Sequence, residues 1–212
     1  MERKSIFRYR DLIACLPVNE QAFDVKASNW VKQLEDHDFI QLFGDNLSIT
    51  LSRRDIKETT EIYLVVLKTI LWGYSAGMRG KHFFNIYKDQ MESICSILRS
   101  IESSCSPETF EEAHKELGKI RSLGLSTYSK LLYFLGVSLV DGGSALILDE
   151  RIIRIFRSQK FEEFNSFNKI SVENGYRYYL NYIQKIHELA KQMQVKEDQI
   201  ELFLFTFGNN LK

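Results

Sequence analysis

Apolar residues, with one threonine among them, recur every three or four positions over residues 55–72, which is the spacing of one face of an α-helix. The positions on this face are Ile56, Thr60, Tyr63, Leu64, Leu67, Ile70 and Leu71. Three glycines fall within residues 73–80. The pattern therefore predicts a helix that ends at Gly73 and a loop after it.

Helical spacing continues along most of the chain. Ser106 is a favourable N-cap and Pro107 a favourable first residue, so a helix is predicted from there to about Leu117, before Gly118. Further helices are predicted over residues 83–98, over 126–135 with Ser126 or Thr127 as cap, from residue 148 onwards, and over 172–193 and 197–207. No alternating strand pattern persists, so the predicted fold class is all-α.

The first 50 residues are mixed in pattern. Ser28 is a candidate N-cap for a helical stripe that runs to Ile40. Residues 39–43 either end that helix or form a short extended piece. No internal repeat or low-complexity tract is found in the sequence.

Composition indicates an ordinary globular protein, with 44% hydrophobic and 26% charged residues. No apolar stretch approaches the roughly 20 residues that span a bilayer, and no apolar core follows the charged N-terminus as in a secretory signal. The three cysteines, Cys15, Cys95 and Cys105, have no metal-ligand spacing, and neither do the four histidines. We therefore expect a cytoplasmic, monomeric protein with no membrane contact, no metal and no cofactor.

Net charge is zero, with 28 basic and 28 acidic residues. A non-specific DNA-binding domain is usually basic, so DNA binding requires positive charge gathered on one face. Residues 114–134 hold four basic residues and one acid, and they are the clearest local excess.

A short turn at residues 120–124 joins two predicted helices within that basic segment. Such a turn exposes backbone N–H groups at the start of the second helix, where the helix dipole also favours an anion. The residues predicted to contact a DNA phosphate here are Lys119, Arg121, Ser122, Gly124, Ser126 and Thr127. The alternative is an ordinary helical hairpin with a glycine turn.

The turn, the helix after it and the segment at residues 146–153 together resemble the helix-hairpin-helix DNA glycosylase superfamily. That pattern is a Leu-Pro-Gly-Val-Gly hairpin, a helix, and a loop to an aspartate at the next helix start. Ile120, Leu123 and Gly124 match it, whereas Arg121 and Ser122 replace the proline and the first glycine. Residues 128–134 and 72–80 look closest to the bacterial 8-oxoguanine glycosylase-like branch.

The resemblance covers about residues 60–160 and implies two helical lobes around a central cleft. We expect a single domain over 1–212, with a glycosylase-like core at 55–160. Residues 1–50 would form an N-terminal extension, and residues 170–212 would be helices packed on the core.

Two residues carry the chemistry that the resemblance implies. Asp149 matches the aspartate that stabilises the positively charged sugar of the transition state, and its alternative role is a helix cap. A lysine that attacks the sugar as an amine is found in the bifunctional enzymes of the superfamily. Aligning the hairpin glycine puts Ser126 at that position, whereas counting back from Asp149 puts Lys130 there. Because loop lengths vary, the alignment on the hairpin glycine is preferred. Lys130 therefore remains a candidate nucleophile, and its alternative role is a phosphate-contacting or solvated lysine.

The glycine-rich loop after Gly73 is a second candidate region. Trp72, Tyr74 and Met78 are predicted to line a base pocket, and Arg79 and Lys81 to contact DNA. The alternative is a connector with one buried tryptophan. The spaced row of Tyr176, Tyr179 and Tyr182 is expected to be a core or groove-lining face rather than a base-stacking platform.

Three functions follow from these features. The first is a DNA N-glycosylase that flips out a modified base and excises it from damaged duplex DNA. The expected modified base is an oxidised purine. The second is a DNA-binding domain of this fold without catalysis, which the altered hairpin and neutral charge favour. The third is a helical protein-interaction domain.

Overall fold

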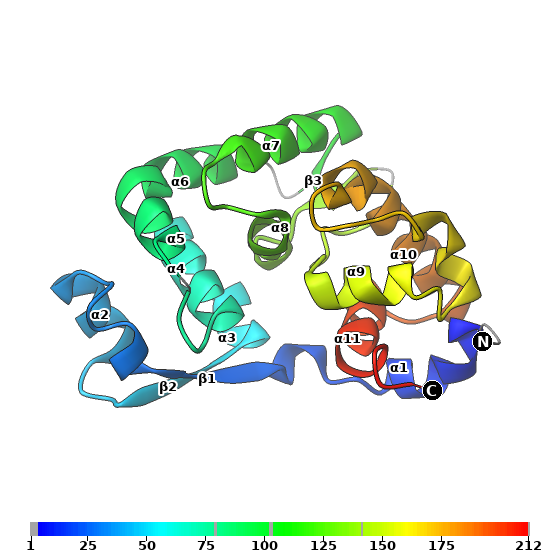
Figure 1. Cartoon of the computed structure of the whole chain (residues 1–212), viewed down its shortest axis with the longest axis horizontal. Helices are drawn as coiled ribbons and strands as arrows, with labels where there is room; N and C mark the ends of the chain where they lie inside the picture. Colours follow the sequence, from blue (N-terminus) through cyan, green and yellow to red (C-terminus); the bar gives the residue numbers. More distant parts are fainter. Residues whose placement is uncertain (1–3, 79, 102–103, 141, 212) are drawn as a thin grey trace.

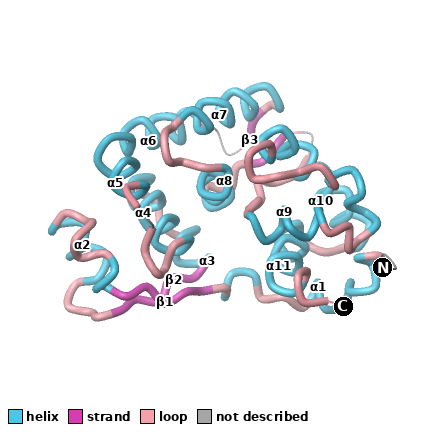
Figure 2. Tube along the Cα trace, in the orientation of Figure 1, coloured by secondary structure: helices cyan, strands magenta, loops and turns pink. Residues whose placement is uncertain are grey.

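The structure is a computed structural model that describes residues 4–211 except 79, 102–103 and 141, and it is mostly helical (Figures 1 and 2). Its α-helices are α1 (Arg10–Ala14), α2 (Asp36–Phe43), α3 (Arg53–Lys57), α4 (Ile62–Gly73), α5 (His82–Phe84), α6 (Met91–Ser100), α7 (Pro107–Lys119), α8 (Leu125–Phe134), α9 (Glu150–Arg157), α10 (Tyr179–Met193) and α11 (Glu197–Phe207). Its strands are β1 (Ala22–Lys26), β2 (Ser48–Ser52), β3 (Ser104–Cys105) and β4 (Ser138–Leu139). The all-α class predicted from the sequence is confirmed.

Several helix ends follow the local signals in the sequence. Ser106 accepts a hydrogen bond from the Thr109 amide and caps α7, with Pro107 as first residue. The predicted ends of α4 at Gly73 and of α11 at Glu197–Phe207 are also confirmed. Gly118 does not end α7, which continues to Lys119.

Other predicted helices are shorter than expected. The helix predicted over 55–72 is two helices, because Ser52 and Asp55 form a reciprocal capping box that starts α3 and the chain leaves the helix before α4. The helix predicted over 83–98 is interrupted by a π-helical turn at Asn85–Gln90, and α10 begins only at Tyr179. The helix predicted from Ser28 is wrong, since α2 starts at Asp36.

An antiparallel pair of β1 and β2 was not predicted from the sequence. In its register Phe23 lies opposite Leu51, and Val25 lies opposite Ile49. Residues 48–52 do alternate between polar and apolar, but five residues are too few to distinguish a strand by pattern alone.

Helix α8 lies between two groups of elements (Figure 1). On one side are α2 to α6 with β1 and β2, and α4 packs directly on α8. On the other side are α9, α10 and α11, joined by the start of the chain: the Lys4 amide donates to the Lys160 carbonyl at 2.9 Å, and α1 packs on α11. The chain thus begins in one group and crosses to the other through β1. Among the described residues, no helix is both long and apolar enough to cross a membrane.

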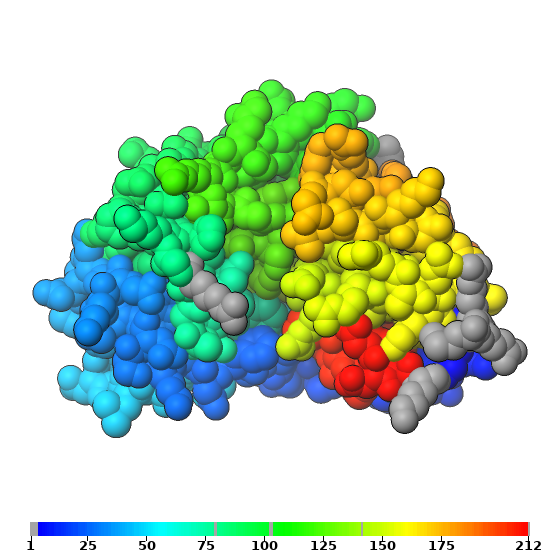
Figure 3. All heavy atoms as spheres, viewed as in Figure 1, coloured from blue at the N-terminus to red at the C-terminus, as the bar shows by residue number. Residues whose placement is uncertain are grey.

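The buried side chains of the two groups are connected through those of α8. Its Leu131 and Leu132 have no exposed surface, and neither do Val66 and Leu67 on α4. The space-filling view in Figure 3 shows the outer surface recessed where the first group approaches α9. The two groups therefore share one apolar core while leaving a depression between them.

Candidate active site

The turn between α7 and α8 adopts the conformation of a glycine-containing hairpin although a serine occupies its tightest position. Ser122 has φ +71°, in the left-handed region that glycine adopts most easily. Asn85 donates from Nδ2 to Ser122 Oγ at 3.0 Å, which holds the strained residue in place. Leu123 is buried, and Gly124 is exposed.

Gly124 caps α8, so the cap predicted at Ser126 or Thr127 is wrong. Within the described chain, the amides of Gly124, Leu125 and Ser126 have no acceptor, as expected for the first turn of a helix. Three aligned N–H donors at a helix start suit a phosphate oxygen.

The other residues predicted to contact DNA at the turn divide into exposed and buried side chains. Lys119 and Arg121 are exposed, and Lys119 pairs with Glu116 at 2.5 Å on the surface. Thr127 is only 1% exposed and its Oγ1 bonds the Tyr74 hydroxyl at 2.9 Å. This burial is at odds with a DNA contact by the Thr127 side chain.

Asp149 is the N-cap of α9, and its side chain is half-buried at the edge of a pocket. Its Oδ1 accepts from the amides of Arg151 at 2.9 Å and Ile152 at 3.2 Å. No bond of Oδ2 is found among the described residues. The carboxylate is therefore fixed by one oxygen, as the cap interpretation predicted, and keeps the other for a further contact.

The segment that leads to Asp149 is held on two sides. Ser129 on α8 accepts from the Leu148 amide at 3.2 Å. The hydroxyls of Tyr179 and Tyr182 donate to the carbonyls of residues 146 and 147 at 2.8 and 3.1 Å. Both tyrosines are fully buried, which confirms their interpretation as core, whereas Tyr176 is exposed. Their function is to position the aspartate loop.

Lys130 is a buried lysine whose hydrogen-bond acceptors are both neutral. It is 6% exposed, and Nζ donates to Ser126 O at 2.6 Å and Ser126 Oγ at 2.8 Å. Burial lowers the pKa of Lys130, and the negative charges of Asp149 and Glu201 oppose this only in part. The alternative of a solvated lysine is wrong.

The two alignments that assign the nucleophilic lysine of the superfamily either to Ser126 or to Lys130 lead to the same place in the structure. The two residues are one turn apart on α8, bonded to each other, and both line the same pocket. A lysine one turn later along the helix therefore reaches the site that the hairpin register assigns to Ser126.

This pocket has a volume of about 260 Å³ and lies between the two groups of elements. It brings together the sequence-predicted residues Asp149, Lys130, Ser126, Trp72 and Tyr74. Its other lining residues, which the sequence did not indicate, are Phe23, Arg53, Gly73, Ser75, Ile147, Arg151, Glu201 and Phe205.

The predicted base-pocket residues of the glycine-rich loop do not all reach this site. Trp72 is 3% exposed and meets the rings of Phe23 and Phe134 edge to face, so little more than its pocket-facing edge is open. Met78 and Lys81 line a different depression beside Phe84, so Met78 is not part of the pocket. Arg79 lies outside the described residues.

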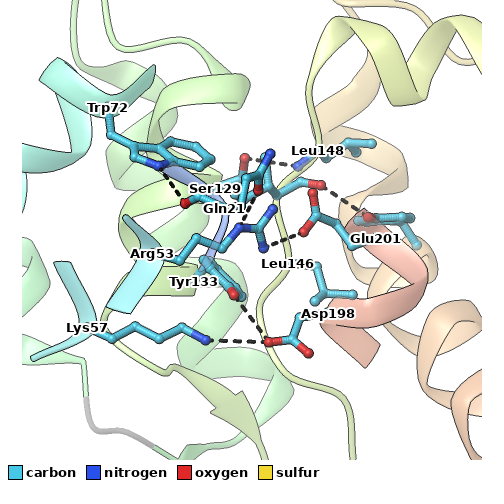
Figure 4. A network of polar contacts seen from close by, with 12 residues as sticks. Gln21, Arg53, Lys57, Trp72, Ser129, Tyr133, Leu146, Leu148, Asp198 and Glu201 are labelled. Atoms are coloured by element: carbon cyan, nitrogen blue, oxygen red, sulfur yellow. Dashed lines mark hydrogen bonds and ion pairs between the residues drawn. The ribbon is translucent and has the colours of Figure 1, made fainter. Parts of the chain in front are cut away.

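A buried ion pair between Arg53 and Glu201 was not predicted from the sequence (Figure 4). Arg53 and Glu201 are both buried, and Arg53 Nη1 lies 2.7 Å from Glu201 Oε2. Arg53 also donates to Gln21 at 2.6 Å and lies over the rings of Trp72 and Tyr133. The pair joins α3 to α11 across α8, which sequence spacing alone does not reveal.

Within the described residues, one carboxylate oxygen of Glu201 makes no hydrogen bond. Burial raises the pKa of Glu201, and Arg53 opposes this through charge and hydrogen bonding. Its Oε1 has no hydrogen bond among the described residues although it is buried at the pocket wall. An acid on the apolar face of the last helix was the only sequence signal for this residue.

These observations define an all-α protein of glycosylase-like fold with a lysine and a carboxylate in one pocket. The family model described as "Putative 8-oxoguanine DNA glycosylase OGG-like protein" matches residues 16–205, and the chain belongs to this family. Membership indicates a DNA glycosylase, and hence an enzyme that binds DNA. No curated protein and no solved structure matches the chain.

Proposed function

We propose that the protein is a helix-hairpin-helix DNA N-glycosylase, of the bacterial 8-oxoguanine type, that excises an oxidised purine and also has lyase activity. The observation that carries the proposal is the shared pocket of Lys130 and Asp149, with the lysine amine buried and its pKa lowered. A catalytic amine needs to be neutral to attack, and burial favours its neutral form.

The turn at residues 120–124 would hold the phosphate backbone of the damaged strand. The free amides of Gly124 and Leu125 donate to a phosphate oxygen, and Lys119 and Arg121 add positive charge at the same surface. Backbone contacts of this kind position a strand without reading its sequence.

The pocket would receive one nucleotide flipped out of the helix. Its volume lies just below the usual range of ligand pockets, which suits a single flat base. The rings of Trp72 and Phe205 supply apolar wall, and Glu201 Oε1 supplies an acceptor for an N–H group on the base edge.

Base removal then proceeds by displacement at the sugar. The Lys130 nitrogen forms a bond to C1′ while the bond from C1′ to the base nitrogen breaks, and the base leaves with a proton. Asp149 stabilises the positive charge that develops on the sugar. Ring opening gives a Schiff base between Lys130 and the sugar. Loss of a 2′ proton from this imine then breaks the bond from C3′ to its phosphate oxygen, so the 3′ phosphate leaves and the strand is cleaved.

Excision is tested with 8-oxoguanine, unmodified guanine and abasic sites in single-stranded and duplex oligonucleotides. We expect release of the oxidised base and a covalent complex after borohydride reduction, which is lost in Lys130→Ala. Lys185→Ala is the matched control, because Lys185 is a surface lysine of α10 paired with Glu188. Salt-dependent binding with neither product nor complex on any of these DNAs would contradict the proposal.

Such a result would favour a non-catalytic DNA-binding protein. The zero net charge and the use of Asp149 as an ordinary helix cap support this second candidate. It predicts that Asp149→Asn and Lys130→Ala leave DNA affinity and its salt dependence unchanged.

A further inference from the structure

A second pocket, of about 390 Å³, lies beside the hairpin turn on the other face of α8. Tyr128 lines this pocket and Lys130 lines the first, and two positions along a helix differ by about 200° in direction. Leu123 and Gly124 of the turn form part of its wall. The same strand that contacts the turn therefore passes the opening of this second pocket.

Two buried polar atoms of this second pocket have no partner among the described residues. They are His114 Nδ1 and the Tyr128 hydroxyl, on side chains that are 6% and 2% exposed. A buried polar group without a partner destabilises the folded chain, so each such atom calls for an explanation.

The protonation of these side chains defines what they can bind. His114 Nε2 lies 2.9 Å from the Tyr176 carbonyl oxygen, which only accepts, so Nε2 carries the proton and Nδ1 is an acceptor. Burial lowers the pKa of His114 and raises that of Tyr128, so both are neutral at pH 7. Two aromatic side chains that line the second pocket thus carry one unpartnered acceptor and one unpartnered hydroxyl donor, as far as the described residues show.

Among the described residues that line the second pocket, the basic side chains lie at its rim. Lys115 and Lys119 line the opening and are exposed, each held by a surface ion pair with a glutamate of its own helix. Glu173 is the one acid on the lining. A neutral aromatic interior below basic side chains fits a nucleobase inside and its phosphates outside.

We propose that the second pocket binds an unpaired nucleobase of the DNA strand held by the hairpin turn, so that the enzyme prefers damage within or beside single-stranded DNA. The proposal rests on the proposed function for the turn's hold on DNA. A paired base is not available to this pocket, because its edge is already bonded within the duplex.

Gly118 is a position where a larger side chain can be added at the opening of the second pocket. It lines the opening, and a Cβ built there meets nothing within 4 Å. Gly118→Leu therefore places a side chain in the opening, and leucine also favours the helix over glycine. Tyr128→Phe is the matched subtle variant, since it removes only the hydroxyl.

Binding is measured by fluorescence anisotropy with a lesion duplex that is either blunt or carries three unpaired nucleotides on the damaged strand, on the 5′ or the 3′ side of the lesion. We expect an unpaired tail on one side to lower Kd about tenfold, which is the effect on affinity of stacking one base. Gly118→Leu should abolish this gain and leave the Kd of the blunt duplex unchanged. Tyr128→Phe should reduce the gain about threefold.

The proposal is overturned if tails give no gain, if Gly118→Leu keeps it, or if it weakens blunt and tailed DNA equally. Excision from the blunt duplex continues in each of these cases, whereas failure of the proposed function appears as no excision from any DNA.

Discussion

Two buried basic side chains, on neighbouring helices beside the same pocket, differ in what compensates their charge. Arg53 on α3 lies 2.7 Å from the Glu201 carboxylate, whereas the acceptors of the Lys130 ammonium on α8, within the described part of the chain, are the two oxygens of Ser126. Burial alone would lower both pKa values. The adjacent Glu201 raises the pKa of Arg53 overall, but that of Lys130 stays lowered.

Under the proposed function, this difference separates a structural cation from a catalytic one. A buried charge is tolerated when it is paired and hydrogen-bonded, and Arg53 meets that condition. Lys130 does not, so its burial lowers its pKa and shifts the equilibrium toward the neutral amine, which is the nucleophilic form. Withholding a carboxylate partner from a buried lysine is therefore a way to prepare it for attack.

The largest expected effect is on covalent chemistry at Lys130. Lys130→Ala should lower the single-turnover rate of borohydride-trapped complex at least about 10³-fold, because the attacking nitrogen is absent. Arg53→Lys, which keeps a positive charge beside Glu201, should retain trapping. If Lys130→Ala still forms the complex, the amine lies elsewhere.

The next effect is on stability at Arg53. Arg53→Leu leaves the buried Glu201 carboxylate unpaired and should lower the free energy of unfolding by about 3–5 kcal/mol, measured with urea. The double variant Arg53→Leu with Glu201→Leu should recover most of that loss. If the single and double variants lose the same free energy of unfolding, the ion pair does not stabilise the contact between α3 and α11.

A smaller effect is expected at Asp149, the carboxylate whose charge acts on Lys130. Asp149→Asn should lower the excision rate about 10²-fold by removing negative charge beside the developing cation. The unfolding free energy should change by less than about 1 kcal/mol, because asparagine caps helices as well as aspartate does. Loss of stability in step with activity would favour a purely structural cap.

The smallest effect is a pH dependence of stability from Lys130. Because its folded pKa lies below its unfolded value near 10.5, protons leave the folded state first, and stability from this group rises with pH. Lys130→Met should therefore be more stable than the natural chain at pH 7, by about 1–2 kcal/mol. This advantage should shrink as pH approaches 10.5. A constant difference across pH would exclude a titrating Lys130.

Local signals in the sequence predicted the parts of the fold that depend on neighbours along the chain. Ser106 with Pro107 fixed the start of α7, and Asp149 before an apolar helix marked the start of α9. The strands β1 and β2 were missed because they are short and their stability depends on pairing with each other.

The candidate site was predicted in part for the same reason. Asp149, Lys130 and Trp72 belong to patterns readable in sequence, and all three line one pocket. Arg53 and Glu201 are 148 residues apart, so their pairing depends on the packing of α3 and α11. Ser122 stands where the hairpin pattern that the sequence resembles has a glycine, yet it keeps a glycine-like φ, and Asn85 from a distant turn holds its side chain.

The central claim is that burial without a carboxylate partner lowers the pKa of the Lys130 amine, and a titration tests it most directly. The chain is labelled with ¹³C at lysine Cε, and the Lys130 signal, assigned by its absence in Lys130→Met, is followed with pH by NMR. We predict a midpoint below 10.5, the ordinary value for a lysine side chain. A Lys130 midpoint at or above 10.5 would contradict the account.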